Sequence, residues 1–407
     1  MSGLTLAEEL ELIRRGAEDI FPETELEEKV RRSRVTGQPL RVKLGVDPTG
    51  AELHLGHIIP VLKLRQFQEL GHQAVLIIGD YTGMVGDPSG RNQARPQLSH
   101  EEVMENARTY QAQAFTILDP ERTEVVHNGS WFAKLTFRET VELMAGTTVA
   151  RILEREDFTT RYREGNPIGL HELLYPLMQG YDSAMVRADV ELGGIDQKFN
   201  ILAGRDIQKA FGQEPQVGVC NPLLLGTDGV EKMGKSLNNY IGIAEPPSEM
   251  YGKVMSIPDH LMTSYFELIT LVDMGQVRQW EASMQKGTVN PRDVKRRLAR
   301  EIVARFHDQD AARKAEEHFD RVHVQKDLPD EIPDVEVAET TIWITRLVAV
   351  AGLAPSHAEA RRLVEQGGVR LDGQVITDAS YQWPVRHGAV LQVGKRRFAR
   401  IVAPGRV

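Results

Sequence analysis

Residues 47–57 read DPTGAELHLGH, and this stretch joins a predicted strand to a predicted helix. It follows RVKLGV (41–46), a short apolar run that is typical of a buried β-strand. It leads into HIIPVLKLRQFQEL (57–70), whose apolar spacing predicts an α-helix. A helix that starts directly after a sheet strand presents unpaired N–H groups and the positive end of its dipole. The stretch therefore predicts an anion-binding site.

Four residues within this stretch indicate what kind of anion binds. Gly56 lets a flat group approach the backbone, while Thr49, His54 and His57 offer hydrogen-bond donors. Two histidines three residues apart could ligate a metal, but zincins space them by four with an intervening Glu, and we predict no metal site. A purely structural histidine pair is the plainer alternative. We interpret the stretch as a nucleotide site with the phosphates facing the helix start.

Short apolar runs alternate with helical patterns along the first 228 residues. Strands are expected at 41–46, 74–79, 124–128 and 190–194, and helices at 57–70 and 100–118. Strands separated by helices predict an α/β fold with a doubly wound, Rossmann-like parallel sheet, which we assign as a catalytic domain over 1–228. Ligands bind at the carboxyl ends of such strands, where the loops DPTG, GDYTGMVGDPSG and GGIDQ follow.

Beyond residue 228 the sequence pattern changes again. Residues 229–245, around KMGKS, predict a mobile loop and connection, and residues 246–325 are helical in pattern. The segment 326–340 holds two prolines and six acids, which is typical of a stiff, extended linker. From 341 to 407 the pattern is helix, turn, helix and then short strands, which predicts a small α+β domain.

Composition indicates the class of protein. Of the 407 residues, 41% are hydrophobic and 26% are charged, as in soluble globular proteins. A single cysteine, Cys220, excludes an internal disulfide framework and a cysteine-rich zinc site. No apolar run approaches the ~20 residues of a membrane helix, and the first residues lack the apolar core of a signal peptide. We therefore expect a cytoplasmic enzyme with no membrane partner.

Charge is unevenly distributed along the chain. The net charge is −9, yet residues 341–407 contain ten Lys or Arg and four Asp or Glu, a net charge of +6. The first 340 residues therefore carry −15. This asymmetry indicates a C-terminal domain that meets a polyanion, although a solvated domain with a chance excess of basic residues would look the same.

Residues 229–236, GVEKMGKS, match the P-loop pattern GxxxxGKS. A P-loop must lead into a long helix, and here LNNYIGIAEPP follows, with two Asn, a Gly and two Pro. We therefore interpret the segment as a loop whose Lys232 and Lys235 reach phosphates as point charges.

HLGH and KMGKS together resemble the two signatures of class I aminoacyl-tRNA synthetases, and five motifs occur in the order found in the bacterial tyrosyl-tRNA synthetases, which they resemble. The five are DPTGAELHLGH (47–57), GDPSG (86–90), YPLMQGYD (175–182), GGIDQ (193–197) and KMGKSLNNYI (232–241). In addition, NPRDVKRRLAREIV (290–303) is similar to the helical domain of that family, and residues 344–390 resemble its S4-type RNA-binding fold. Each motif is weakly specific alone, but the resemblance covers nearly the whole chain.

The resemblance implies a reaction in two steps. The carboxylate of L-tyrosine attacks the α-phosphate of ATP and releases pyrophosphate, and the tyrosyl group then moves to the 3′ end of tRNA(Tyr). ATP is a substrate, accompanied by Mg²⁺, and no tightly bound cofactor is implied. The same resemblance implies a homodimer, with 246–325 as an α-helical anticodon-side domain and 341–407 as an S4-like RNA-binding domain.

The resemblance also implies roles for residues at the matching positions. Catalytic contacts to ATP and its leaving pyrophosphate would come from Thr49, His54, His57, Arg91, Arg95, Lys232 and Lys235. ATP-binding residues would be Asp47, Gly56, His57, Asp196 and Lys235. The tyrosine site would comprise Lys43, Asp87, Tyr175, Gln179, Asp182 and Gln197. Within it, Asp87, Tyr175 and Gln179 would hold the amino group, and Asp182 would accept the phenol hydroxyl.

Two positions of the implied tyrosine site are open to another interpretation. Tyr175, Gln179 and Asp182 share one helical face and could be a solvated stripe, but apolar neighbours such as Leu177 indicate burial. Lys43 stands where well-known members of the family carry a tyrosine that donates to the substrate hydroxyl. We expect Lys43 to point at that hydroxyl and to donate in its place.

Three other functions fit part of the sequence. A tryptophanyl-tRNA synthetase shares the first motif, but it lacks the S4-like tail and has no use for a hydroxyl acceptor at Asp182. A P-loop NTPase acting on RNA would use residues 229–236. An RNA-binding relative without catalysis is disfavoured by the intact HLGH and by both loop lysines.

Overall fold

The computed structural model describes residues 3–48, 50, 52–89, 99–324, 332–394 and 397–403. Three of the expected site residues, Thr49, Arg91 and Arg95, lie outside this part of the chain. The chain divides into two compact units, Met1–Glu316 and Glu317–Val407. No helix in the described residues is long and apolar enough to cross a bilayer.

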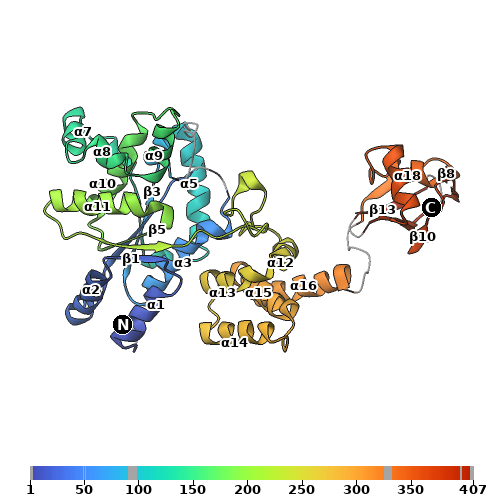
Figure 1. The fold of residues 1–407 in the computed structure, drawn as a ribbon, viewed down its shortest axis with the longest axis horizontal. Helices are drawn as coiled ribbons and strands as arrows, with labels where there is room; N and C mark the ends of the chain where they lie inside the picture. The colour runs from blue at the N-terminus through green and yellow to red at the C-terminus, as the bar shows by residue number, and fades with distance from the viewer. Residues whose placement is uncertain are drawn as a thin grey trace. The chain divides into compact units, whose positions relative to one another are not determined.

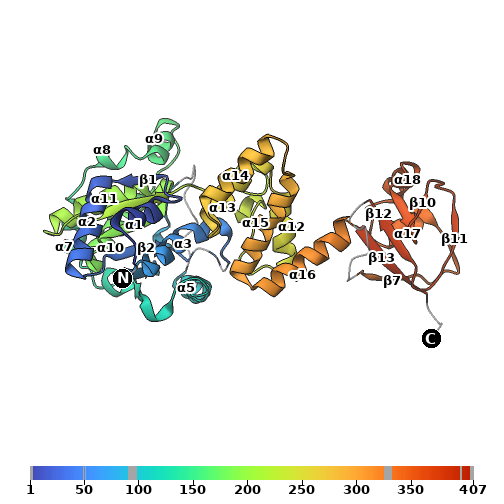
Figure 2. The ribbon, with the colours of Figure 1, turned by 90° about the horizontal axis from the view of Figure 1, so that it is seen from below.

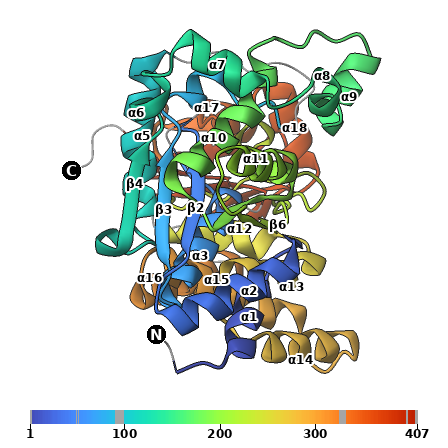
Figure 3. The same ribbon diagram turned by 90° about the vertical axis from the view of Figure 1, so that its left-hand side faces the viewer.

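In the described part of the first unit, six strands form one sheet in the order β1-β6-β5-β2-β3-β4. They are β1 (Asp19–Phe21), β2 (Arg41–Val46), β3 (Gln73–Ile78), β4 (Thr123–His127), β5 (Val190–Gly194) and β6 (Val217–Asn221). Neighbours run parallel except β1, which pairs antiparallel with β6. Figure 3 shows β2, β3 and β4 side by side. The predicted doubly wound parallel sheet is confirmed, but β1 and β6 were not predicted.

The order of the strands creates a switch point at β2. The chain proceeds from β2 to β3 and β4 on one side, and later adds β5 and β6 on the other side. The connections therefore leave the carboxyl ends of β2 and β5 in opposite directions, and a crevice opens between them. Open α/β sheets bind their ligands in this crevice.

Helices cover both faces of this sheet. The helices are α1 (Leu6–Arg14), α2 (Glu23–Thr36), α3 (Leu55–Glu69), α4 (Thr82–Val85), α5 (His100–Ala114), α6 (Gly129–Phe132), α7 (Phe137–Met144), α8 (Val149–Ile152), α9 (Glu156–Arg163), α10 (Tyr175–Val186) and α11 (Lys198–Ala210). The helices predicted at 57–70 and 100–118 are confirmed as α3 and α5. Val42 and Leu44 of β2 pack into the core with α1, α2, α3 and α5, whereas Val75 of β3 faces the end of α10. Because side chains alternate along a strand, Lys43 faces the α10 side.

A close helix crossing holds α10 in place. A Cβ on Gly180 of α10 would lie 2.8 Å from the Cα of Gly204 on α11, so the two backbones touch. Figure 1 shows α10 and α11 lying against each other beside the sheet. Since α10 carries Tyr175, Gln179 and Asp182, this crossing positions one wall of the crevice.

The remainder of the first unit is helical. After a short 3₁₀ turn, η4 (Lys235–Leu237), come α12 (Pro247–Ser256), α13 (Met262–Ile269), α14 (Met274–Gln285), α15 (Pro291–Phe306) and α16 (Gln309–Phe319). The predicted helix at 290–307 is confirmed as α15, with Pro291 at its first position and Asn290 accepting from the Arg292 N–H at 3.0 Å. Its basic face is partly neutralised, because Glu316 pairs with Arg296 and Arg300.

The second unit combines two helices with short strands, as predicted. Its elements are β7 (Asp334–Glu336), β8 (Thr341–Trp343), α17 (Ile344–Val350), α18 (His357–Glu365), β9 (Val369–Leu371), β10 (Gln374–Ile376), β11 (Gln382–Pro384), β12 (Val390–Val393) and β13 (Arg397–Val402). Figure 2 shows these strands beside α17 and α18. Because β7 pairs with β13, residues 334–336 belong to this sheet and not to the extended linker predicted there. Residues 326–331 of that linker lie outside the described residues.

Candidate active site

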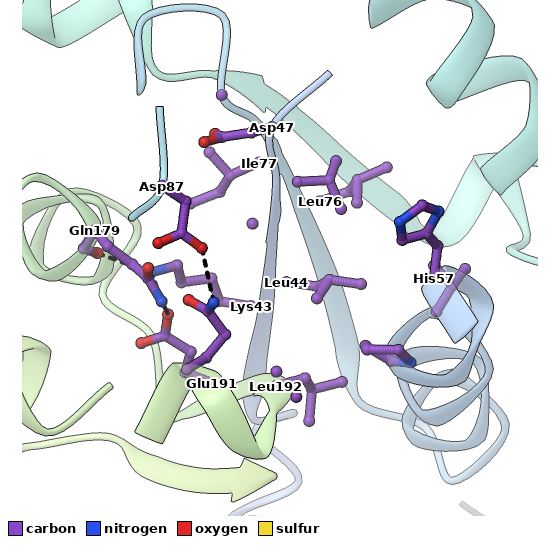
Figure 4. Close-up of a pocket in the computed structure, with 18 of the residues that line it drawn as sticks. Lys43, Leu44, Asp47, His57, Leu76, Ile77, Asp87, Gln179, Glu191 and Leu192 are labelled. Atoms are coloured by element: carbon purple, nitrogen blue, oxygen red, sulfur yellow. Dashed lines mark hydrogen bonds and ion pairs between the residues drawn. The ribbon is translucent and has the colours of Figure 1, made fainter. Parts of the chain in front are cut away.

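A cavity of about 290 Å³ lies at the switch point of the sheet. Its walls come from the ends of β2, β3 and β5 and from the starts of α3 and α10. Figure 4 shows the side chains that converge on it. The sequence-predicted residues that line it are Lys43, Asp47, Gly56, His57, Asp87, Tyr175, Gln179, Asp182, Asp196 and Gln197. The fold therefore brings together residues that lie more than 150 positions apart in the sequence.

Asp47 joins three elements at the mouth of β2. Its Oδ1 accepts from Thr82 Oγ1 at 2.7 Å, and its Oδ2 accepts from the Tyr175 hydroxyl at 2.8 Å. The bond to Thr82 requires Gly79, because a Cβ at that position would lie 2.0 Å from Asp47 Oδ1. The Asp47 carboxylate thus links the end of β2 to α4 and to α10 through hydrogen bonds.

The two histidines of HLGH have different environments. His57 lines the cavity, while His54 is buried behind it and their rings stack with centroids 3.6 Å apart. Burial, followed by the charges of His57 and Lys235, lowers the pKa of His54 to about 3. His54 is therefore neutral at physiological pH, and its ring packs against the ring of His57. Gly56 suits this position, because a Cβ there would lie 3.2 Å from the His54 ring, a tight contact that the ring would have to yield to.

The KMGKS segment is not a P-loop. The three-residue η4 takes the place of the long helix that a P-loop needs, so the P-loop NTPase hypothesis is excluded. The segment folds back onto α3: Leu55 N donates to Ile241 O at 3.0 Å, and His54 forms a β-bridge with Gly242. Lys235 Nζ lies 3.6 Å from the position that a Cβ on Gly50 would take. The charge of Lys235 therefore lies next to the start of α3.

Asp196 lies on the opposite side of the cavity, in the turn after β5. Burial raises its pKa, as does the nearby charge of Asp87, while the charge of Lys232 lowers it. Lys232 therefore lies within electrostatic reach of this carboxyl. The lysines of the KMGKS segment thus face both sides of the cavity mouth.

Asp182 lies at the buried end of the cavity. It accepts hydrogen bonds from Asn128 Nδ2 at 3.1 Å and from Trp131 Nε1 at 2.9 Å. Burial raises its pKa to about 7, and the charge of Lys43 is the largest effect in the other direction. A carboxylate has about four lone-pair sites, so two fixed donors leave room for a further donor from a ligand. Asn128 and Trp131, which directly follow β4, were missed by the sequence analysis.

Lys43 does not point at an open hydroxyl site. In the described structure its buried Nζ donates to Gln179 O at 2.9 Å, Ser183 Oγ at 2.7 Å and Glu191 Oε1 at 2.8 Å. These bonds use the three N–H groups of the ammonium. The expectation that Lys43 donates to a substrate hydroxyl is therefore not met. Glu191 was also missed, although a charged residue inside the buried strand VELGG was a usable signal.

Polar side chains connect the remaining predicted residues. Gln197 Nε2 donates to Asp87 Oδ2 at 2.8 Å, and Asn200 Nδ2 donates to the side chains of both Gln197 and Gln179. Arg155, which was not predicted, lies behind them and reaches Asp87 at 3.5 Å. Among the described residues there is no cluster of three or more His, Cys, Asp or Glu that could hold a metal ion.

Comparison with known proteins places the chain in a family. The family model of class I tRNA synthetases (W and Y) matches residues 36–324, and that of the S4 domain matches residues 343–390. A tyrosine–tRNA ligase of Moorella thermoacetica is 54% identical over 396 residues, covering 97% of this chain and 96% of the relative. The chain belongs to the tyrosyl-tRNA synthetase family. The tyrosyl-tRNA synthetase resemblance, the enzyme class and the S4 domain are thereby confirmed.

Other tyrosyl-tRNA synthetases agree with this assignment. The tyrosine–tRNA ligase of Carboxydothermus hydrogenoformans is 50% identical over 403 residues, covering 98% of each chain. The structure of the Archaeoglobus fulgidus tyrosyl-tRNA synthetase in complex with L-tyrosine superposes with a TM-score of 0.62 at 25% identity. It covers 77% of this chain and 100% of that one.

Proposed function

We propose that this chain activates L-tyrosine with ATP and then transfers the tyrosyl group to the 3′ end of tRNA(Tyr) in the cytoplasm. The observation that carries the choice of amino acid is the buried Asp182, held by Asn128 and Trp131 at the end of the cavity. An acceptor at this depth favours a side chain that ends in a hydroxyl, because an apolar ring would leave the carboxylate without a ligand donor.

Amino-acid-dependent exchange of pyrophosphate into ATP tests the proposal. Tyrosine should support exchange, whereas tryptophan and phenylalanine should support far less. Exchange that is driven best by tryptophan would assign the chain to the other amino acid of its family model.

The proposed chemistry needs no protein nucleophile, because the substrate's own carboxylate attacks the α-phosphate. The protein aligns the two substrates and stabilises charge on the transferring phosphate. The start of α3, His57 and the two lysines Lys232 and Lys235 are suited to this role. ATP would enter as its Mg²⁺ complex, with the cation held by phosphate oxygens. Thr49, Arg91 and Arg95 keep their implied roles as proposals outside the described residues.

We assign the cavity walls to the two substrates. Asp87, Tyr175 and Gln179 present oxygen acceptors for the ammonium group of tyrosine, and Gln197 supports Asp87 from behind. On the ATP side, Asp196 would accept from the ribose, and Gly56 leaves space for the nucleoside next to the backbone of α3. Asp47 acts as a positioning residue, because it accepts a hydrogen bond from the Tyr175 hydroxyl.

We propose that two chains pair through α7 and α8. Phe137, Val141 and Met144 share one face of α7 and are exposed by 85%, 47% and 45%, and Val149 of α8 is exposed by 63%. An apolar face of this kind is typical of an interface. Phe137→Asp should shift the sedimentation coefficient toward that of a monomer. The control is Val35→Asp, since Val35 is exposed by 82% and lies on α2, outside the proposed interface. If both variants stay dimeric, α7 is not the interface.

A further inference from the structure

The floor of the cavity is a buried ion pair between two adjacent strands. Lys43 on β2 lies directly opposite Glu191 on β5 in the parallel register, and both side chains point to the α10 face of the sheet. They are 0% and 1% exposed, and Lys43 Nζ lies 2.8 Å from Glu191 Oε1. A buried pair of charges costs desolvation free energy that offsets much of its attraction, so the pair by itself is weak evidence of a stabilising role.

Both members of the pair hold the same residue of α10. Lys43 donates to the backbone carbonyl of Gln179 at 2.9 Å, and Glu191 accepts from the side-chain Nε2 of Gln179 at 3.0 Å. Glu191 is itself fixed, because Ser183 and Gln216 also donate to its second oxygen. Gln179 is thus held at its backbone and at its side chain. Figure 4 shows Lys43, Gln179 and Glu191 together at one end of the cavity.

The charged groups also decide which way the side-chain amides face. An ionised Glu191 can only accept, so Gln179 must turn its nitrogen toward it and its oxygen away. That oxygen accepts from Asn200 Nδ2 at 3.0 Å. At the far end, Arg155 can only donate, and its Nη1 donates to Asn200 Oδ1 at 3.1 Å. With an acceptor at one end and a donor at the other, only one orientation of the two amides satisfies every bond.

We propose that Lys43 and Glu191 are positioning residues that fix the Gln179 amide with its oxygen available to the ammonium group of the substrate. The inference rests on the proposed activation of tyrosine and refines it: the pair acts on the part common to all amino acids, not on the phenol. Without Lys43, Glu191 would be left as an unpaired buried charge and would take up a proton. A protonated Glu191 could donate as well as accept, and the Gln179 amide would be free to turn its nitrogen toward the substrate.

Three compounds separate this role from a phenol-reading role. Tyrosine has both the ammonium and the hydroxyl, phenylalanine lacks the hydroxyl, and 3-(4-hydroxyphenyl)propionate lacks the ammonium. We expect Lys43→Met to lower kcat/KM in pyrophosphate exchange by about tenfold or more for both tyrosine and phenylalanine, the loss typical of a bond to a charged group. These measurements are made at about pH 8.5, because loss of the Lys43 charge would raise the pKa of Asp182, and Asp182 must be ionised in every variant for the phenol to be bound equally. The inhibition constant of 3-(4-hydroxyphenyl)propionate against tyrosine and the KM for ATP should then stay within about twofold.

Two further variants keep the test decisive if Lys43→Met folds poorly. Glu191→Gln keeps the shape of the side chain but can present either atom to Gln179, so it should give the same loss for both amino acids. The double variant Lys43→Met with Glu191→Gln strands no charge, and its loss should be smaller than the product of the two single losses. Lys29→Met is the matched control. Lys29 lies on α2, outside the cavity lining, and is 1% exposed. Its Nζ pairs with Glu214 at 3.1 Å.

The results that would overturn the inference are distinct from one another. If Lys43→Met weakens tyrosine and 3-(4-hydroxyphenyl)propionate but spares phenylalanine, then Lys43 reads the phenol. If all three compounds and ATP weaken together, or if Lys29→Met gives the same pattern, the pair has only a structural role. If the unaltered protein shows no tyrosine-dependent exchange, the proposed function fails before the positioning question arises.

Discussion

Asp182 combines deep burial with a raised pKa of about 7, and we expect this to make both stability and activity depend on pH near neutrality. The folded protein holds the proton up to about pH 7, while the unfolded chain releases it near the ordinary value of 3.8. The contribution of Asp182 to the free energy of unfolding therefore falls as the pH rises from about 4 to 7. Activity should change with pH in the opposite direction and rise with pH, because only the ionised carboxylate is a full acceptor for the phenol hydroxyl.

We predict that kcat/KM for tyrosine falls about tenfold per pH unit below pH 7, since it reports the ionisation of the free enzyme. Pyrophosphate exchange measured from pH 5.5 to 8.5 checks this. Phenylalanine, which donates nothing to Asp182, serves as the control and should not show the same fall. A tyrosine profile that is flat across this range would mean that Asp182 is ionised throughout or does not bind the hydroxyl.

Lys235 allows a prediction about the leaving group. If its ammonium stabilises the pyrophosphate as it forms, Lys235→Ala should slow adenylate formation by about 100-fold, or ~3 kcal/mol of transition-state stabilisation. Single-turnover kinetics give this rate, and equilibrium binding of tyrosine should be unchanged. A large loss of tyrosine affinity with an unchanged maximal rate would place Lys235 at the amino acid and not at the phosphates.

At the scale of elements, the crossing of α10 and α11 positions the tyrosine site. Gly180→Ala would force the two helices apart, because the new Cβ would lie 2.8 Å from the Gly204 backbone. We expect a loss of about 1–3 kcal/mol in the free energy of unfolding from overpacking. The KM for tyrosine should rise as well, because α10 carries Gln179 and Asp182. Chemical denaturation and exchange kinetics on the same preparation measure both effects.

The control for this change is Gly252→Ala in the middle of α12. A Cβ at Gly252 would meet nothing within 4 Å, so the substitution should stabilise the helix slightly, by about 0.5–1 kcal/mol. The KM for tyrosine should not change. If Gly180→Ala destabilises the protein without affecting the KM, the crossing supports the fold but does not place the site.

At the scale of the whole molecule, activation and charging should be separable. The cavity residues lie within the first unit, whereas the net charge of +6 lies in residues 341–407. Because β7 belongs to the sheet of the second unit, the appropriate truncation removes 332–407. Tyrosine-dependent exchange should persist, while charging of tRNA(Tyr) should collapse and the affinity for tRNA should lose much of its salt dependence. Equal damage to both reactions would mean that the second unit stabilises the catalytic fold.

The fold class and most members of the site could be predicted from the sequence, because these depend on local patterns. The strand at 41–46 and the helix after it are specified by apolar periodicity, and the loops that follow β2, β3 and β5 bear Asp47, Asp87 and Asp196 of the cavity. Short strands with little apolar pattern were missed, such as β1, whose three residues are stabilised by pairing with β6. Likewise, the acids of 334–336 suggested a linker, but pairing with β13 outweighed that composition.

The role of Lys43 could not be predicted in this way, because it depends on contacts that form only in the assembled sheet. Its neighbours in sequence show a charged residue in a buried strand, which suggested a contact to substrate. The partner that satisfies it is Glu191, which lies 148 residues away and becomes adjacent only because β5 is added beside β2. Strand order is set by packing of the whole sheet and not by any local pattern. For the same reason the donors to Asp182, which come from Asn128 after β4 and Trp131 in α6, could be located only once the sheet was assembled.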